Sequence, residues 1–106
     1  MVSLEDFKKL ELRIAEIEAV APHPNADRLY VLTLRIGEAV KTVVAGIRKH
    51  YGEEELRGKK IVVVNNLEPA VIRGVESQGM ILAASEGEVL TLVVPERPIP
   101  SGAAVR

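Results

Sequence analysis

The feature that most constrains the fold is a set of short strand-like segments. From Tyr30 to Ile36 every second residue is large and apolar, which is typical of a strand with one buried face. Ile61 to Val64 is apolar and β-branched without alternation, so we expect a strand buried on both faces. No apolar run approaches the ~18 residues that a membrane helix requires. The sequence therefore predicts a fold of short strands.

Weaker patterns predict the remaining elements. Ser3 is a suitable helix N-cap with Asp6 in the first turn, so a turn or two of helix is expected before Leu12. The apolar face then passes from Leu12 and Ile14 to Ile17 and Ala19, and this one-residue phase shift predicts a β-bulge. We expect the other segments as follows: His23–Asp27 a loop, Lys41–Ala45 a strand joined to the previous one at Gly37-Glu38, Gly46–Gly58 partly helical, and Met80–Ala84 with Val89–Val94 a hairpin around Glu86-Gly87-Glu88.

The order of these elements indicates the fold class. Three strands, a short helical connection and then two or more strands is the order of an OB-fold. We therefore predict an all-β protein, a small five-stranded OB-fold barrel with short helical elements. The tail Pro95–Arg106 holds three prolines and should be extended. The same pattern is compatible with an SH3-like barrel. At 106 residues, one domain spanning 1–106 is expected.

The residues that usually carry chemistry are sparse. There is no cysteine, and the only histidines, His23 and His50, lack metal-ligand spacing and are expected to be surface imidazoles. Ser77 and Ser85 lie outside any nucleophile motif. Phosphate-cradling glycine motifs are also absent. We therefore predict a binding domain without catalytic residues, metal or cofactor.

Charge and aromatic content narrow the kind of partner. The formal net charge is −1, so any basic surface must be local, and the candidate cations are Arg48-Lys49, Lys59-Lys60 and Arg73. The chain has one Phe, two Tyr and no Trp, too few to stack a row of unpaired bases. An RNA partner should therefore be a folded one, recognised by shape, phosphates and ribose hydroxyls.

Five segments occur in an order that resembles a known family. They are Asp6–Ile14, His23–Leu29, Val43–Ile47, Asn66–Pro69 and Arg73–Ser85. Together they resemble the tRNA-binding domain family, which is found at the C-terminus of many methionyl-tRNA synthetases and as free-standing structure-specific tRNA-binding proteins. The resemblance implies an OB-fold that binds tRNA as a folded shape, at the outer corner of the L, independently of sequence.

By position, the resemblance implies the following tRNA contacts: Asn66, Arg73, Ser77, Met80 and Ser85, with Lys49 as an auxiliary phosphate contact. The amide and hydroxyls can donate to phosphate or ribose oxygens, the guanidinium of Arg73 can pair with a phosphate, and Met80 can lie against a base. Each also has a structural interpretation. Met80 can belong to the core, Asn66 can close a turn, and Ser77 can bond local backbone. For His23–Asp27 we favour a structural loop in which Asp27 bonds the backbone.

The resemblance further implies partners and location. Many members are homodimers, and the tail ending at Arg106 is similar to their C-terminal extension. The methionyl-tRNA synthetase catalytic chain is a further expected partner. The charged N-terminus and the short apolar runs of the sequence itself predict a cytoplasmic location and no membrane partner. The same domain also resembles a bacterial export-associated chaperone, so a homodimeric peptide-binding module is the alternative function.

Overall fold

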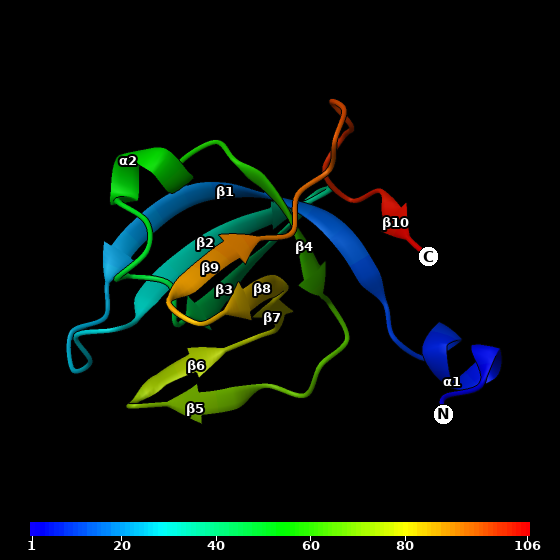
Figure 1. The fold of residues 1–106 in the computed structure, drawn as a ribbon, viewed down its shortest axis with the longest axis horizontal. Helices are drawn as coiled ribbons and strands as arrows, with labels where there is room; N and C mark the ends of the chain where they lie inside the picture. The colour runs from blue at the N-terminus through cyan, green and yellow to red at the C-terminus, as the bar shows by residue number, and fades with distance from the viewer.

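The computed structural model describes all 106 residues, which form short strands and two very short helices (Figure 1). The elements in chain order are α1 (Leu4–Lys8), β1 (Leu12–Pro22), β2 (Tyr30–Ile36), β3 (Ala39–Ala45), α2 (Glu53–Leu56), β4 (Lys60–Val64), β5 (Ala70–Ile72), β6 (Val75–Ser77), β7 (Met80–Ile81), β8 (Ala83–Glu86), β9 (Val89–Leu92) and β10 (Ala104–Val105). No helix is long and apolar enough to span a membrane.

The main sheet is antiparallel and curls into a half-barrel, which confirms the all-β, OB-like prediction (Figure 1). Its strand order is β3-β2-β1-β4-β7, with β10 added on β1. The long strand β1 pairs with β4 through its first half and with β2 through its second half. The register against β2 shifts between Ile17 and Ala19, so the expected bulge is present. It lies at Glu18, which leaves Ala19 exposed and puts Val20 in the core.

The core inside the half-barrel is aliphatic. It holds the alternating residues of β2, the inward residues of β4, and Leu56 of α2, which is fully buried. All four residues from Ile61 to Val64 are buried, as expected for a strand covered on both faces. Ile61 and Val63 face the core, while Val62 and Val64 face a second cluster with Leu12 and Ile14 on the other side of the sheet.

The barrel is closed between β3 and the segment after β6. One backbone bond joins Gln78 N to Thr42 O at 2.8 Å, and the Gln78 side-chain oxygen accepts from Thr42 N at 2.8 Å. Next to it, Ser77 Oγ accepts from Val44 N at 2.9 Å. We call this contact the closing seam. Side chains therefore supply two of its three hydrogen bonds, where a continuous sheet would use backbone groups.

The C-terminal tail covers the second cluster. It is extended, as expected, and β10 pairs Val105 with Leu12. Gly102 N donates to Ile14 O at 2.7 Å, and Ser101 Oγ accepts from Gly37 N at 3.2 Å. Ala103 and Val105 pack on the cluster. The tail is thus part of the folded domain, fastened to β1 and to the β2–β3 turn.

Two local predictions need correction, and one hairpin was missed. The segment expected as one strand from Met80 to Ala84 is divided, because β7 pairs with β4 whereas β8 pairs with β9. The hairpin of β5 and β6 was not predicted, since Ala70–Ser77 lacks a clear alternation of apolar residues. His23 is 3% exposed rather than a surface imidazole, because the loop beyond it folds against the β5–β6 hairpin.

Candidate nucleic-acid interface

The β5–β6 hairpin presents Arg73 at its tip. The strands pair Ile72 with Val75, which leaves Arg73 and Gly74 as a two-residue turn. Both have positive φ, 53° and 90°, as type I′ turns require. Arg73 is the sole non-glycine residue of the chain with positive φ. This conformation costs on the order of 1 kcal/mol for a residue with a Cβ, so an arginine is kept here against local preference.

The loop between β1 and β2 holds this turn in place. His23 Nδ1 accepts from Asn25 N at 2.9 Å, so the ring proton is on Nε2, which donates to Ile72 O at 3.0 Å. The imidazole therefore joins its own loop to the end of β5. Arg73 adds a third bond by donating from Nη2 to Asn25 O at 2.9 Å. No side-chain hydrogen bond of Asp27 is formed, so histidine and asparagine take the role expected of that aspartate.

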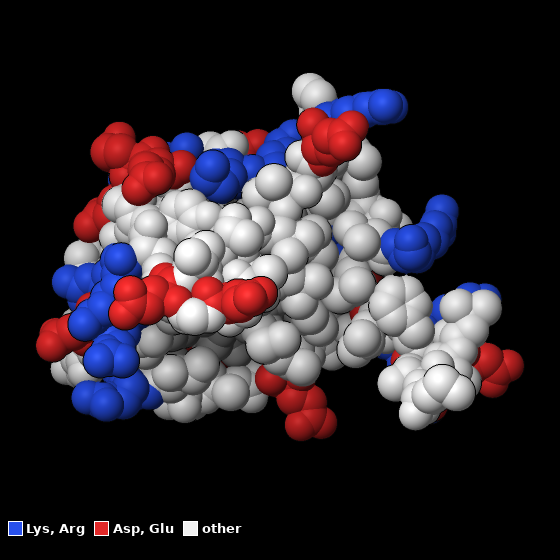
Figure 2. All heavy atoms as spheres, in the orientation of Figure 1, with Lys and Arg blue, Asp and Glu red and all other residues white.

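Cationic side chains gather around this loop. Arg28 and Arg73 line a shallow groove of about 430 Å³ with Asn25 and Asp27. Arg48, which follows β3, reaches the same loop and donates from Nη1 to Ala26 O at 3.2 Å. Figure 2 shows Lys and Arg side chains concentrated at this end of the molecule, where Figure 1 places the β5–β6 turn. We call Arg28, Arg48 and Arg73 the arginine cluster. The exposed Lys49 follows Arg48 in the chain.

Two of the expected contact residues are occupied by internal hydrogen bonds. Ser77 is 3% exposed and, besides accepting from Val44 N in the closing seam, donates to Gly79 O at 3.0 Å. Asn66 accepts from Glu11 N at 2.8 Å and donates to Lys9 O at 2.7 Å, which fixes the link between α1 and β1. Ser77 thus bonds local backbone, as its structural interpretation anticipated, whereas Asn66 joins distant backbone groups instead of closing a turn.

Met80 and Ser85 are accessible. Met80 is 49% exposed on β7, while its neighbour Ile81 points into the core. Ser85 is exposed on β8, immediately before the acidic turn that contains Glu86 and Glu88. Figure 2 shows acidic side chains over this β8–β9 region. The structure thus brings Arg73 together with Arg28 and Arg48, and places Ser85 in acidic surroundings.

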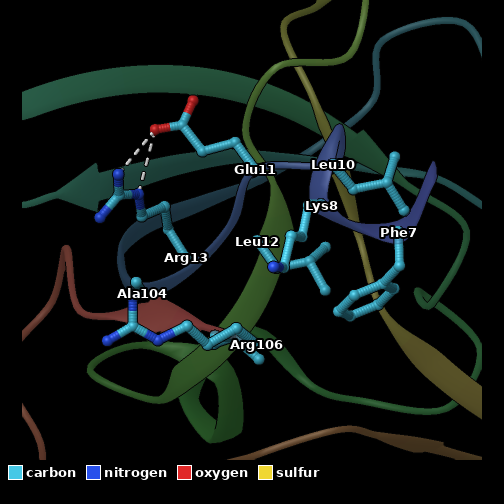
Figure 3. Close-up of a pocket in the computed structure, with 9 residues that line it drawn as sticks. Phe7, Lys8, Leu10, Glu11, Leu12, Arg13, Ala104 and Arg106 are labelled. Carbon is cyan, nitrogen blue, oxygen red and sulfur yellow. Dashed lines mark hydrogen bonds and ion pairs between the residues drawn. The ribbon is translucent and has the colours of Figure 1, made fainter. Parts of the chain in front are cut away.

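An apolar groove lies between α1 and β10. Phe7 and Leu10 line it together with Leu12 and Val105, and its volume is about 370 Å³ (Figure 3). The Glu11–Arg13 ion pair, with 2.9 Å between Oε1 and Nη2, lies at its edge. Helix α1 buries none of its own residues. This part of the chain therefore exposes apolar surface that the fold itself leaves uncovered.

One titratable side chain has a clearly shifted pKa. Leu92 N donates to Tyr51 Oη at 3.1 Å, and this bond, with a contribution from Thr91, lowers the pKa of Tyr51 below its ordinary value. The bond fastens β9 to the segment before α2. No group of three or more His, Asp or Glu side chains is arranged to hold a metal ion.

Comparisons with known proteins agree with this geometry. Residues 12–104 match the family model described as "Putative tRNA binding domain". The methionine–tRNA ligase of Pyrococcus horikoshii is 50% identical over 105 residues, 99% of this chain and 14% of the ligase. The chain thus spans about 14% of the length of that relative.

Solved structures are similar over the whole chain. A MetRS related protein from Pyrococcus horikoshii is 30% identical with a TM-score of 0.93, covering 100% of this chain and 98% of that one. The chaperone CsaA from Bacillus anthracis is 30% identical with a TM-score of 0.90, covering 100% and 99%. The family match extends over most of the chain, and the Pyrococcus horikoshii ligase is identical to it at half of the aligned positions. The chain belongs to the tRNA-binding domain family.

Proposed function

We propose that the domain binds tRNA as a folded shape, at the outer corner of the L and independently of sequence. The observation that carries this proposal is the arginine cluster on a chain of net charge −1. Localised cations suit phosphates in one fixed arrangement, whereas few aromatic residues are present to stack unpaired bases. The family match supports tRNA as the folded partner.

As direct contacts we propose Arg73, Lys49, Met80 and Ser85. Arg73 and Lys49 suit phosphates, Met80 suits an exposed base, and Ser85 suits a ribose hydroxyl. Ser77 and Asn66 support binding from within the fold, by closing the barrel and by holding α1. In this scheme the domain contributes affinity and no chemical step. The reaction belongs to a methionyl-tRNA synthetase with which it is fused or associated in the cytoplasm.

Competition between RNAs tests the proposal. Several folded tRNAs should displace a labelled tRNA at similar concentrations. An unstructured RNA of equal length should require a concentration higher by at least about tenfold, because it lacks the fixed phosphate arrangement. Fluorescence anisotropy at fixed salt measures both. Equal competition by unstructured RNA would show that charge alone drives binding.

We also propose that two copies of the chain form a homodimer through the apolar groove. The helix α1 has 5 residues, too short to be stable alone, yet Leu4, Phe7 and Leu10 are exposed around it. In a twofold dimer each copy offers the same patch, so α1 and the groove of one copy can cover those of the other. The free outer edge of β10 lies beside the same groove.

Phe7→Ser with Leu10→Ser should separate the dimer. Light scattering at micromolar concentration should give about twice 11.5 kDa for the unmodified chain and close to 11.5 kDa for the variant. Val89→Ser is the matched control, because Val89 is 69% exposed and lies outside the groove, and it should stay dimeric. A monomer in all three samples would remove the dimer from the proposal.

The likeness to the chaperone CsaA over the full chain supports peptide binding as the second candidate. The same apolar groove would then receive an extended apolar peptide. Labelled peptide binding that competes with dimer formation and leaves tRNA affinity unchanged would favour this function. Since the arginine cluster is separate from the residues that line the groove, the two functions are distinguishable by substitution.

A further inference from the structure

Three arginines lie on or against the β1–β2 loop, and none of them pairs with a carboxylate. Arg28, Arg48 and Arg73 form no ion pair, although the chain has five ion pairs elsewhere. Asp27 lines the same groove as Arg28 and Arg73, and it is the one acidic residue there. Two guanidinium groups line this groove against one carboxylate, and Arg48 adds a third positive charge on the same loop, so positive charge is in local excess. An exposed arginine side chain usually pairs with a carboxylate or extends into solvent, so the convergence of three arginines on one loop requires an explanation.

Two of the three arginines are also held in fixed positions. Arg48 and Arg73 each use one Nη donor on a loop carbonyl, that of Ala26 and that of Asn25. Their other guanidinium N–H groups form no hydrogen bond within the chain. The loop is in turn fixed by the buried His23. A guanidinium held by one bond loses less side-chain entropy on binding an anion, and it can offer the paired donors that a phosphate accepts.

The backbone conformation of Arg73 also favours a binding role for its side chain. Arg73 adopts a left-handed conformation at a turn where Asn or Gly is usual. Strained backbone conformations of this kind cluster at functional sites, where the side chain takes part in binding. Arg28 is exposed and forms no side-chain hydrogen bond at all, so its five donors remain available.

We propose that Arg28, Arg48 and Arg73 together form a binding site for consecutive backbone phosphates of a folded RNA, with the His23–Asn25 loop as its rigid support. The inference rests on the proposed function and adds Arg28 and Arg48 to the contacts expected from family resemblance. The site takes phosphodiesters and reads no base, because the residues that line the groove offer guanidinium groups and no aromatic surface for stacking.

Salt-dependent binding of a labelled tRNA tests the site. Arg28→Ala and Arg48→Ala should each lower affinity about tenfold, and each should flatten the slope of log affinity against log salt by somewhat less than ~1. Arg28→Lys should restore most of the slope and less of the affinity, since ammonium cannot form the paired bond. Arg28 carries no structural bond, so its variants test the site even if Arg48→Ala fails to fold.

Arg97→Ala is the matched control. Arg97 is exposed, with only a loose ion pair of 3.7 Å to the equally exposed Glu96, and it belongs to the segment between β9 and β10, which Figure 1 places away from the β5–β6 turn. Its substitution therefore removes the same charge elsewhere. It should leave affinity within about twofold, as expected for a surface charge outside the contact. An equal loss with Arg97→Ala, or an unchanged slope with both Arg28 variants, would overturn the site while leaving tRNA binding itself intact.

A second RNA separates this inference from the proposed function. If the unmodified chain binds no tRNA, the proposed function fails, and an RNA duplex of unrelated sequence then serves as the probe. Duplex binding that depends on Arg28 and not on Arg97 would still support the phosphate site. Absence of binding to either RNA would overturn both.

Discussion

Gly79→Ala should destabilise the domain by about 3 kcal/mol, because the added methyl group has no room. A Cβ at this position would lie 2.9 Å from Val64 O and 3.3 Å from Val63 Cγ2. Val64 O is a backbone atom of β4, which is paired with β1 on one side and β7 on the other, so it cannot move away without disturbing the sheet. Urea denaturation should show a lower midpoint with a similar slope, and Tm should fall by on the order of 15 °C.

Gly46→Ala is the control for this substitution. There the nearest atom to an added Cβ is Leu29 Cδ2 at 3.7 Å, an ordinary contact with a side chain. Removing a glycine reduces the freedom of the unfolded chain, so this variant should be neutral or slightly more stable. Equal stability of the two variants would contradict the tight packing of Gly79 between the closing seam and β4.

Gly102→Ala should release the C-terminal tail at a cost of about 3 kcal/mol, through backbone strain and a close contact. Gly102 has a φ of +92°, and its added Cβ would lie 2.9 Å from Gly37 Cα. The tail would then leave Leu12 and Val64 exposed, since Ala103 and Val105 cover them. Urea denaturation measures the loss, and a fluorescent apolar dye reports the uncovered surface. If the groove holds the dimer, light scattering should also show dissociation.

Gly58→Ala separates backbone strain from steric contact as causes of the destabilisation expected for Gly102→Ala. Gly58 has a similar φ of +86°, but an added Cβ there meets nothing within 4 Å. Strain alone should cost about 1 kcal/mol, and the tail should remain in place. A loss in Gly58→Ala as large as that in Gly102→Ala would show that the contact with Gly37 is unimportant.

The sequence indicated those parts of the fold whose pattern is local. The alternation in Tyr30–Ile36 and the unbroken run Ile61–Val64 each report burial of a single strand, and both strands are present. The bulge was predicted, but the assignment of Ala19 to the apolar face with Ile17 was wrong, because Ala19 is small and fits either face, and Val20 takes the buried position. The true position of the bulge depends on pairing with Thr33, which is distant in the chain.

The parts that could not be predicted depend on contacts between distant segments. Ser77 resembles a surface hydroxyl until β3 supplies the backbone N–H of Val44. His23 resembles a loop imidazole until the carbonyl of Ile72 accepts its proton. Arg28 was not predicted as a contact, because only the fold brings it to the groove that Arg73 lines. For Arg28, the sequence offered only a local signal. Asn25 in its loop and Gly74 in the β5–β6 turn are residue types typical of turns.

The closing seam has a consequence for how the barrel moves. Across the other strand pairs, opening the sheet means breaking a backbone ladder, whereas at the seam it means releasing Ser77 and Gln78 from β3. A hydroxyl and an amide can exchange these bonds for water at modest cost. We therefore expect the half-barrel to open first along the closing seam, while its backbone ladders stay intact. The β5–β6 hairpin is joined directly to that side, but its tip stays bonded to the His23–Asn25 loop, so we expect opening at the seam to leave Arg73 in place.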